Sequence, residues 1–182
     1  DGTNLYVTGS FNHKIRMIGI DNRSVTTLAG TGSAGEADND NGSLASFDTP
    51  YGITTDGTNL YVADSFNHSI RQIGIDNRSV TTLAGDGSFG SSNGVGTSAE
   101  FKRPYGITTD GTNLYVADTN NHTIRQIGID NRSVTTLAGT VGSSGSANGV
   151  GTLASFNYPY GITTDGTNLY VADKSNDLIR QI

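Results

Sequence analysis

The sequence contains no cysteine, no tryptophan and only one methionine among its 182 residues. Without cysteine the chain has no disulfide framework, no thiolate metal site and no thiol nucleophile. No apolar run approaches the roughly 20 residues of a membrane-spanning helix, and no signal peptide is visible. Only 34% of the residues are hydrophobic, which argues against a helical bundle around one continuous apolar core. These absences indicate that the chain is built from short secondary-structure elements.

Charge is also scarce, at 15% of the residues, which is too little for a charge-driven disordered tail. The balance of 17 acidic to 11 basic residues gives a net charge of −6, so a nucleic-acid partner is not expected. What the chain has instead is 25 glycines, together with many Thr, Ser, Asn and Asp residues. This composition is typical of short strands joined by many turns.

A repeat of 54 or 55 residues organises the whole chain. Such a fixed period indicates a repeat architecture, either a solenoid or a propeller. Residues 51–85 and 105–139 differ at only three of 35 positions, so the copies are close to identical. The segment DGTNLYV marks the copies, with starts at Asp1, Asp56, Asp110 and Asp165.

Each repeat contains four runs with the pattern of β-strands. YGITT ends at Asp56-Gly57, a strong hairpin signal. LYVAD follows, with Leu60 and Val62 on one face, and then come SIRQIGI and SVTTLAG. Four antiparallel strands that cannot bury their own faces indicate propeller blades stacked around an axis. A β-helix would have shorter coils, and a leucine-rich horseshoe would show a Leu/Asn ladder.

We therefore predict an all-β propeller segment of about 3.5 blades and 14 strands. Too few blades are present to close a ring, so the chain either belongs to a longer protein or self-associates. The first part of each linker is expected to be a loop, and its LASF or SAEF segment to form one helical turn. The single domain 1–182 divides into a three-strand blade 1–30, blades 51–85 and 105–139, a partial blade 160–182, and linkers 31–50, 86–104 and 140–159.

The strings VADSFNHSIR at 62–71 and VADTNNHTIR at 116–125 closely resemble the NHL repeat. Both follow PYGITTDGTNLY and precede VTTLAG, and the resemblance covers the whole chain. The first copy departs from it at Thr8-Gly9, where the others have Ala-Asp, and the last has Asp177 in place of His. The resemblance implies blades of a β-propeller, typically six-bladed. It also implies a choice of roles: RNA binding, protein interaction, extracellular sensing or, in one group, amidating-lyase activity.

Three histidines, His13, His68 and His122, occupy the same position in successive copies. A shared metal would require all three to lie about 2 Å from one ion, which is feasible only beside the propeller axis. They sit instead in the turn between the second and third strands, farther from the axis. We predict that each orders its own turn through a local hydrogen bond.

Cofactor motifs are weak, and we expect no cofactor. Residues 30–35 and 85–90 fit G-x-G-x-x-G, but no helix pattern follows directly to hold a pyrophosphate. Glu36, Asp38 and Asp40 alternate in the first linker and could gather around Ca²⁺, although the EF-loop pattern fails. A solvated acidic loop is the simpler interpretation.

No catalytic set is visible either, because no base accompanies a nucleophile and no G-x-S-x-G occurs. Asp64 and Arg71 flank one turn, and their recurrence predicts a structural pair. The same spacing recurs at Asp118 and Arg125 and at Asp173 and Arg180.

The copies differ mainly in the linkers and in the turns between the second and third strands, which a propeller places at one end. We predict a non-enzymatic binding or scaffold module that presents this loop-rich face to a protein or glycan, secreted by a microbe or displayed on its surface. The alternatives are a structural self-assembling repeat protein, as ring or fibre, and a metal-dependent NHL-type lyase. The candidate binding face comprises Phe11, Asp38, Asp40, Phe66, Phe89, Lys102, Arg103 and Asn120.

Overall fold

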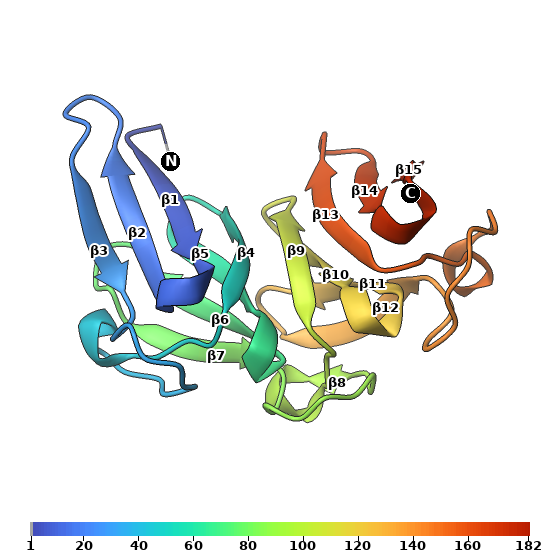
Figure 1. Cartoon of the computed structure of the whole chain (residues 1–182), viewed down its shortest axis with the longest axis horizontal. Helices are drawn as coiled ribbons and strands as arrows, with labels where there is room; N and C mark the ends of the chain where they lie inside the picture. The colour runs from blue at the N-terminus through green and yellow to red at the C-terminus, as the bar shows by residue number, and fades with distance from the viewer. Residues whose placement is uncertain (1) are drawn as a thin grey trace.

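The computed structural model describes residues 2–182 as four antiparallel blades set side by side in an open arc (Figure 1). Both chain ends lie on the open side of the arc. The only helices among the described residues are one-turn 3-10 helices, and none of them is long and apolar enough to cross a membrane. The all-β propeller architecture is therefore confirmed, with an incomplete ring.

The second and third blades carry four consecutive strands in the order predicted. Each starts with a hairpin whose turn is fixed by an aspartate: the Asp56 carboxylate accepts the backbone N–H groups of Thr58 and Asn59, at 2.8 and 2.7 Å. Gly57 supplies the positive φ of 91° that this turn requires. The strands are β4 (Pro50–Thr55), β5 (Asn59–Asp64), β6 (Ser69–Gly74) and β7 (Val80–Ala84), then β9 (Pro104–Thr109), β10 (Asn113–Asp118), β11 (Thr123–Gly128) and β12 (Ser133–Ala138).

The first and fourth blades have three strands each. The first begins with the second strand of the repeat, and the fourth ends with the third strand. Their strands are β1 (Asn4–Gly9), β2 (Lys14–Gly19) and β3 (Val25–Ala29), and β13 (Pro159–Thr164), β14 (Leu169–Asp173) and β15 (Leu178–Gln181).

The core lies between blades, so both faces of an internal strand are buried. In β5 the side chains of Leu60, Tyr61, Val62 and Ala63 all have 0% exposure, although they alternate between the two faces. This explains how a chain with few hydrophobic residues still forms a core: each sheet shares its apolar faces with its neighbours.

The linkers are more than the loops we predicted. β8 (Gly94–Val95) in the second linker pairs with the outer strand β12 of the next blade. In the first linker, Asn39 forms the corresponding bridge to Val80 of β7. Each of these linkers thus covers the exposed edge of the blade that follows it, which removes an unpaired strand edge. The sequence analysis did not predict β8, which brings the strands within residues 2–182 to fifteen, one more than the fourteen predicted.

The predicted helical turn in each linker exists but lies slightly earlier in the chain. It spans η2 (Gly42–Leu44), η4 (Gly96–Ser98) and η6 (Gly151–Leu153). The segment after the turn is extended and inserts a phenylalanine between blades, at Phe47, Phe101 and Phe156.

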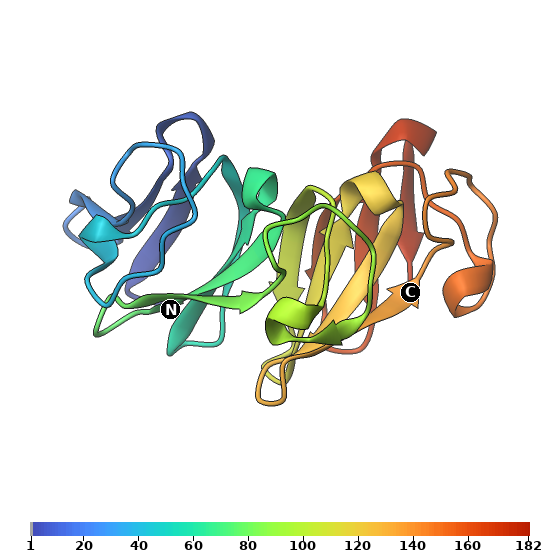
Figure 2. The same ribbon diagram turned by 90° about the horizontal axis from the view of Figure 1, so that it is seen from below.

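The turns between the second and third strands all lie at one end of the blades, which we call the turn end (Figure 2). The register pairs Pro50 with Asp64 and Ala84 with Ile70, so the linkers also start and finish at the turn end. The predicted common face is confirmed. Its one-turn helices are η1 (Ser10–Asn12), η3 (Ser65–Asn67), η5 (Thr119–Asn121) and η7 (Lys174–Asn176).

The innermost strands approach each other closely at the axis of the arc. A Cβ atom added to Gly52 of β4 would collide with the carbonyl oxygen of Tyr105 in β9, and Gly106 has the same relation to Tyr160. Glycine is therefore required at this position for the blades to meet. Gly161 of β13 has no such neighbour, because its added Cβ would meet only Ala172 at 3.8 Å.

Candidate functional site

A buried ion pair holds each linker to the following blade. Arg71 of β6 donates to the carboxylate of Asp64 in β5 at 2.9 Å, and both side chains have 0% exposure. The same guanidinium donates to the carbonyl oxygens of Ser46 and Ala37 in the linker. Burial raises the pKa of Asp64 to about 6, against the hydrogen bond from Asn67 and the charge of Arg71. The predicted Asp–Arg pairing is present, and its role is structural.

Asp38 completes this arrangement from the linker. Its carboxylate accepts from Arg71 at 2.6 Å and from the backbone N–H of Thr82 at 2.9 Å. Asn93 and Asn148 hold Arg125 and Arg180 in the same way. Within residues 2–182, no three His, Cys, Asp or Glu side chains are grouped so that they could hold a metal ion.

The histidines bond to the neighbouring linker and not, as we predicted, within their own turn. The ring Nδ1 of His68 accepts the backbone N–H of Arg103, 35 residues further on, at 3.1 Å. His13 and His122 accept from Thr49 and Tyr158 in the same way. The physical reason is that the linker returns over the turn end just where the ring projects.

These hydrogen bonds stabilise linker residues whose backbone conformation is unfavourable. Thr49, Arg103 and Tyr158, whose N–H groups the histidines accept, have φ values of 53°, 52° and 52°, in the left-handed region. The pKa of His68 is lowered by burial and by the nearby Arg103 charge, and that of His122 by burial and Lys102. A lowered pKa keeps the imidazole neutral, as an acceptor nitrogen must be.

An aromatic–basic patch lies at the turn end between the second and third blades, and consists of Phe66, Phe89, Lys102 and Arg103. The Arg103 guanidinium lies 4.3 Å from the centroid of the Phe66 ring, which is 41% exposed. The Lys102 ammonium lies 5.9 Å from the centroid of Phe89, which is 70% exposed. Asn120 joins the patch through its backbone N–H, which donates to the Lys102 carbonyl at 3.1 Å.

A row of tyrosines from the innermost strands lies beside this patch. The ring centroids of Tyr51 and Tyr105 are 4.5 Å apart, and those of Tyr105 and Tyr160 are 4.6 Å apart. Burial raises the pKa of Tyr160 to about 12, helped by Tyr51 and Tyr105. A pocket of about 280 Å³ adjoins the row, between the third and fourth blades. Its lining comprises Tyr105, Thr119, Asn120, Tyr158, Tyr160, Lys174 and Ser175.

The structure brings five of the eight predicted face residues together, namely the patch and Asn120. Phe11 is 91% exposed on η1 of the first blade, where Asp48 and Thr49 stand in the positions of the two patch cations. Asp38 and Asp40 flank Asn39, which bridges to the outer strand β7. The sequence analysis missed the tyrosine row. Its signal was present, since each PYGITT segment carries a tyrosine at the start of the innermost strand.

The antiparallel blades and the Asp–Arg ion pair that recurs in three of them define a β-propeller segment of NHL-type blades. The chain is 35% identical over 147 residues to the cattle protein NHL repeat-containing protein 2. The match covers 71% of this chain and 19% of the relative. It is 30% identical over 191 residues to Protein SUPPRESSOR OF QUENCHING 1 of Arabidopsis thaliana, covering 98% of the chain and 18% of that protein. The chain belongs to the NHL-repeat proteins, and spans about a fifth of the length of these relatives.

Solved structures support the same fold. A Bacteroides thetaiotaomicron protein of unknown function superposes with a TM-score of 0.82 at 24% identity, over 98% of this chain and 44% of its own. An auxiliary nutrient binding protein from the same organism has a TM-score of 0.76 at 22% identity, over the same shares of both chains. No family model matches the chain.

Proposed function

We propose that this chain is a non-enzymatic binding module whose turn end receives a protein partner. The main support for this proposal is that the exposed side chains of Phe66 and Phe89 lie beside Arg103 and Lys102 in a single patch. Aromatic and arginine side chains at a surface are the residues that most often dominate the energy of protein interfaces. In a chain with a net charge of −6, this local positive charge favours an acidic region on the partner.

A glycan is the alternative ligand for the same face. The tyrosine pocket offers ring surface, hydroxyl groups and the Lys174 ammonium, which lies 4.9 Å from the centroid of Tyr160. The nutrient-binding neighbour from Bacteroides supports a ligand-binding role for such a propeller and, with it, a secreted or cell-surface position in a microbe. The protein partner is preferred because the patch is the more exposed feature.

A third role, the metal-dependent lyase, would need ligands that converge on one ion. His13, His68 and His122 instead each engage a different linker residue. We therefore place the function in binding.

The test is a selection from a displayed peptide library and a glycan array, each probed with the wild type and with Phe66→Ala/Phe89→Ala. We expect the wild type to enrich acidic peptides that the double variant does not retain. Phe11→Ala is the matched control, because Phe11 has the same place in the first blade as Phe66 in the second, while Asp48 and Thr49 stand there at the positions of Lys102 and Arg103. Glycan hits alone would favour the alternative ligand. Equal enrichment by all three proteins would contradict the proposal.

Self-association is a second candidate, favoured by the end blades. Leu5 and Val7 of the first blade are 56% and 43% exposed, whereas the equivalent Leu60 and Val62 are fully buried by a neighbouring blade. Ile179 of the fourth blade is 74% exposed, against 0% for Ile70. These complementary ends would cover each other if copies stacked. Light scattering on the 19.0 kDa chain tests this, and a clean monomer at every concentration contradicts it.

A further inference from the structure

Two rings of the tyrosine row stack on each other between the third and fourth blades. The rings of Tyr105 and Tyr160 lie nearly parallel, with an interplanar angle of 24° and centroids 4.6 Å apart. Tyr51 meets Tyr105 at a tilt of 55°, and it meets Tyr160 nearly edge-on, at 75° and 6.1 Å. Of the three pairs in the row, the stacked pair is therefore the one that brings the ring carbons of two phenols face to face.

The backbone before each of these two rings is held by the preceding blade. The hydroxyl of Ser65 donates to the carbonyl oxygen of Pro104, and that of Thr119 donates to the carbonyl oxygen of Pro159 at 2.6 Å. Both hydroxyl residues are buried. Gly106 also allows β9 to lie close against β13. The two rings are thus positioned before any reaction, which favours a reaction between them over one with a second molecule.

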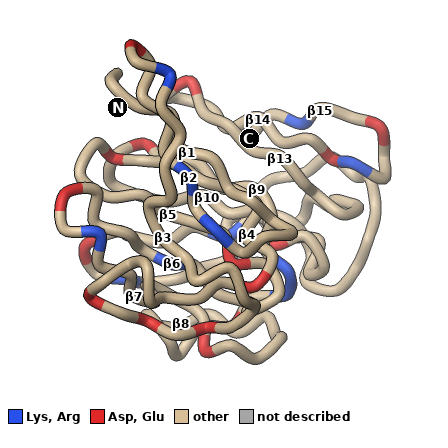
Figure 3. The backbone as a smooth tube through the Cα atoms, turned by 60° about the vertical axis from the view of Figure 1, so that its left-hand side comes forward, with Lys and Arg blue, Asp and Glu red and all other residues tan. Residues whose placement is uncertain are grey.

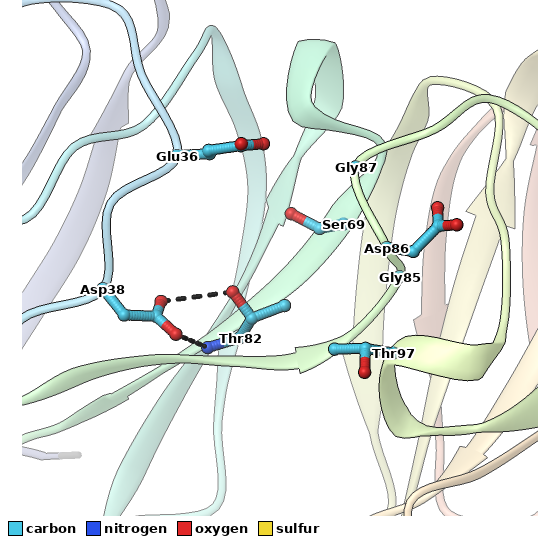
Figure 4. Close-up of a pocket in the computed structure, with 8 residues that line it drawn as sticks. All are labelled: Glu36, Asp38, Ser69, Thr82, Gly85, Asp86, Gly87 and Thr97. Carbon is cyan, nitrogen blue, oxygen red and sulfur yellow. Dashed lines mark hydrogen bonds between the residues drawn. The ribbon is translucent and has the colours of Figure 1, made fainter.

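The stacked pair is open to water and lies apart from the acidic part of the chain. Tyr105 and Tyr160 line the pocket of about 280 Å³ at the turn end. In Figure 3 the acidic positions gather along the edge that carries β7 and β8, away from β9 and β13. A pocket of about 470 Å³ beside β7 (Figure 4) is lined by carboxylates, hydroxyl groups and glycines, and none of its eight residues has an aromatic ring. The stacked pair is therefore a site of its own, separate from that acidic pocket.

The tyrosines outside the row are engaged in other ways. Tyr61, Tyr115 and Tyr170 each donate the hydroxyl proton to the aspartate of their own hairpin turn, at 2.7 or 2.8 Å. Tyr158 packs edge-on against His122, with ring centroids 4.6 Å apart. Within residues 2–182 none of these four rings contacts another tyrosine ring. Chemistry that needs two phenols in contact is thus restricted to the row.

We propose that Tyr105 and Tyr160 form a site of oxidative cross-linking, at which a haem peroxidase with hydrogen peroxide joins the two rings as dityrosine. Each phenol loses one electron to the oxidant and its hydroxyl proton to water, which gives two phenoxyl radicals. The radicals couple through the ring carbons next to the hydroxyl groups, and the hydrogen on each of these carbons moves to the phenol oxygen. One C–C bond forms, two hydrogen atoms leave, and one hydrogen peroxide is reduced to two waters.

The cross-link gives the arc a covalent tie of a kind that needs no cysteine. The chain has no cysteine, so a disulfide is not available to it. A bond between Tyr105 and Tyr160 fastens the innermost strand of the third blade to that of the fourth, at positions one repeat apart. A link of this kind stabilises a fold mainly by restricting the unfolded chain. The site goes beyond the binding role of the turn end and requires no bound partner.

The test is treatment of the full chain, at low protein concentration, with a peroxidase and limiting hydrogen peroxide, followed by digestion and tandem mass spectrometry. The wild type should give a linked pair of peptides joined at Tyr105 and Tyr160, with the mass of two hydrogen atoms lost. Tyr105→Phe and Tyr160→Phe should each abolish this product, because phenylalanine keeps the stacked ring but cannot form a phenoxyl radical. Tyr115→Phe is the matched control and should leave the yield unchanged, since Tyr115 lies outside the row and is bonded to Asp110.

A second readout follows the stability of the product. The oxidised wild type should unfold at a higher temperature than the oxidised Tyr160→Phe variant, because only the former carries the link that restricts the unfolded chain. Covalent dimers as the main product would overturn the proposal, as would a bond from Tyr51 in place of the stacked pair. An equal loss of product in Tyr115→Phe, or equal unfolding temperatures after oxidation, would also count against it.

Discussion

The guanidinium of Arg71 lies over the ring of Phe47, 5.1 Å from its centroid. Arg71 belongs to a strand and Phe47 to the preceding linker, and both are fully buried. Arg125 over Phe101 and Arg180 over Phe156 repeat the contact at 5.1 and 5.2 Å. A cation–π contact thus adds to the ion pair with Asp64 in fastening the linker to the blade.

Arg71→Leu should destabilise the chain by about 3–5 kcal/mol, because it leaves the buried carboxylate of Asp64 without its cation. Arg16→Leu is the matched control. Arg16 has the same place in the first blade, but Gly9 stands there in place of the aspartate. Its Nε donates to the Thr26 carbonyl across a long 3.4 Å, so the control should stay within about 0.5 kcal/mol of wild type. Urea unfolding measures both, and equal losses would contradict the role given to the pair.

Gly52→Ala should destabilise the chain by about 1–3 kcal/mol, since the added methyl group meets the Tyr105 carbonyl and forces the inner strands apart. Gly161→Ala, at the equivalent place in β13, should change the free energy of unfolding by less than about 0.5 kcal/mol. Thermal unfolding followed by circular dichroism compares the two. A tolerated alanine at position 52 would show that the blades can separate at the axis at little cost.

Exchanging segments 86–103 and 140–158 should leave the fold intact and abolish selection by the turn end. Each segment brings a buried phenylalanine, Phe101 or Phe156, to the same place. After the exchange Phe66 would lie next to Tyr158, and Arg103 next to Asn120, so the patch is divided although the composition is unchanged. Phe101→Ala should instead cost about 3–5 kcal/mol. Retained selection in the folded, exchanged protein would remove the patch from the proposed function.

The histidine bonds predict a dependence of stability on pH. Because the pKa values of His68 and His122 are lowered in the folded chain, the unfolded chain takes up protons first as the pH falls. Their contribution is therefore present above the unfolded pKa of about 6.5 and is lost as the pH falls below it.

The variant His68→Asn/His122→Asn isolates this contribution, since asparagine tolerates the left-handed conformation that both histidines adopt. The difference in free energy of unfolding between wild type and variant should be about 1–2 kcal/mol at pH 7.5 and should shrink toward pH 5. Urea titrations across this range measure it. A difference that stays constant would mean that the histidines do not titrate with folding.

Much of the fold could be predicted because its signals are local and repeated. The Asp-Gly turns and the alternating strand patterns mark each hairpin within about ten residues. The repeat period then predicts that these hairpins form successive units of a repeat architecture. β8 was missed because Gly94 and Val95 pair through backbone groups alone, which leave no side-chain pattern. The partner of His68 was missed because it lies 35 residues away, at a place fixed only by the return of the linker.

The candidate site was predictable only in part, for a similar reason. Variation between copies singled out Phe66 and Arg103, which do lie in contact. It also singled out Asp38, which differs from Asn93 and Asn148 yet does the same structural work. Tyr51, Tyr105 and Tyr160 do not vary at all, so a search for differences passed over them. Their convergence follows from the curvature of the arc, which no single repeat encodes.

The attachment of each linker to the blade after it has a consequence for how such arrays grow. The independent unit is not a blade with its trailing segment but a linker with the blade that follows, as in residues 31–85. A duplication or an engineered insertion cut at these limits carries its own edge cover and its own counter-ion for the buried arginine. A cut made between a linker and the blade that follows it, for example before residue 51, would separate Phe47 from Arg71 and begin the new copy with a defect.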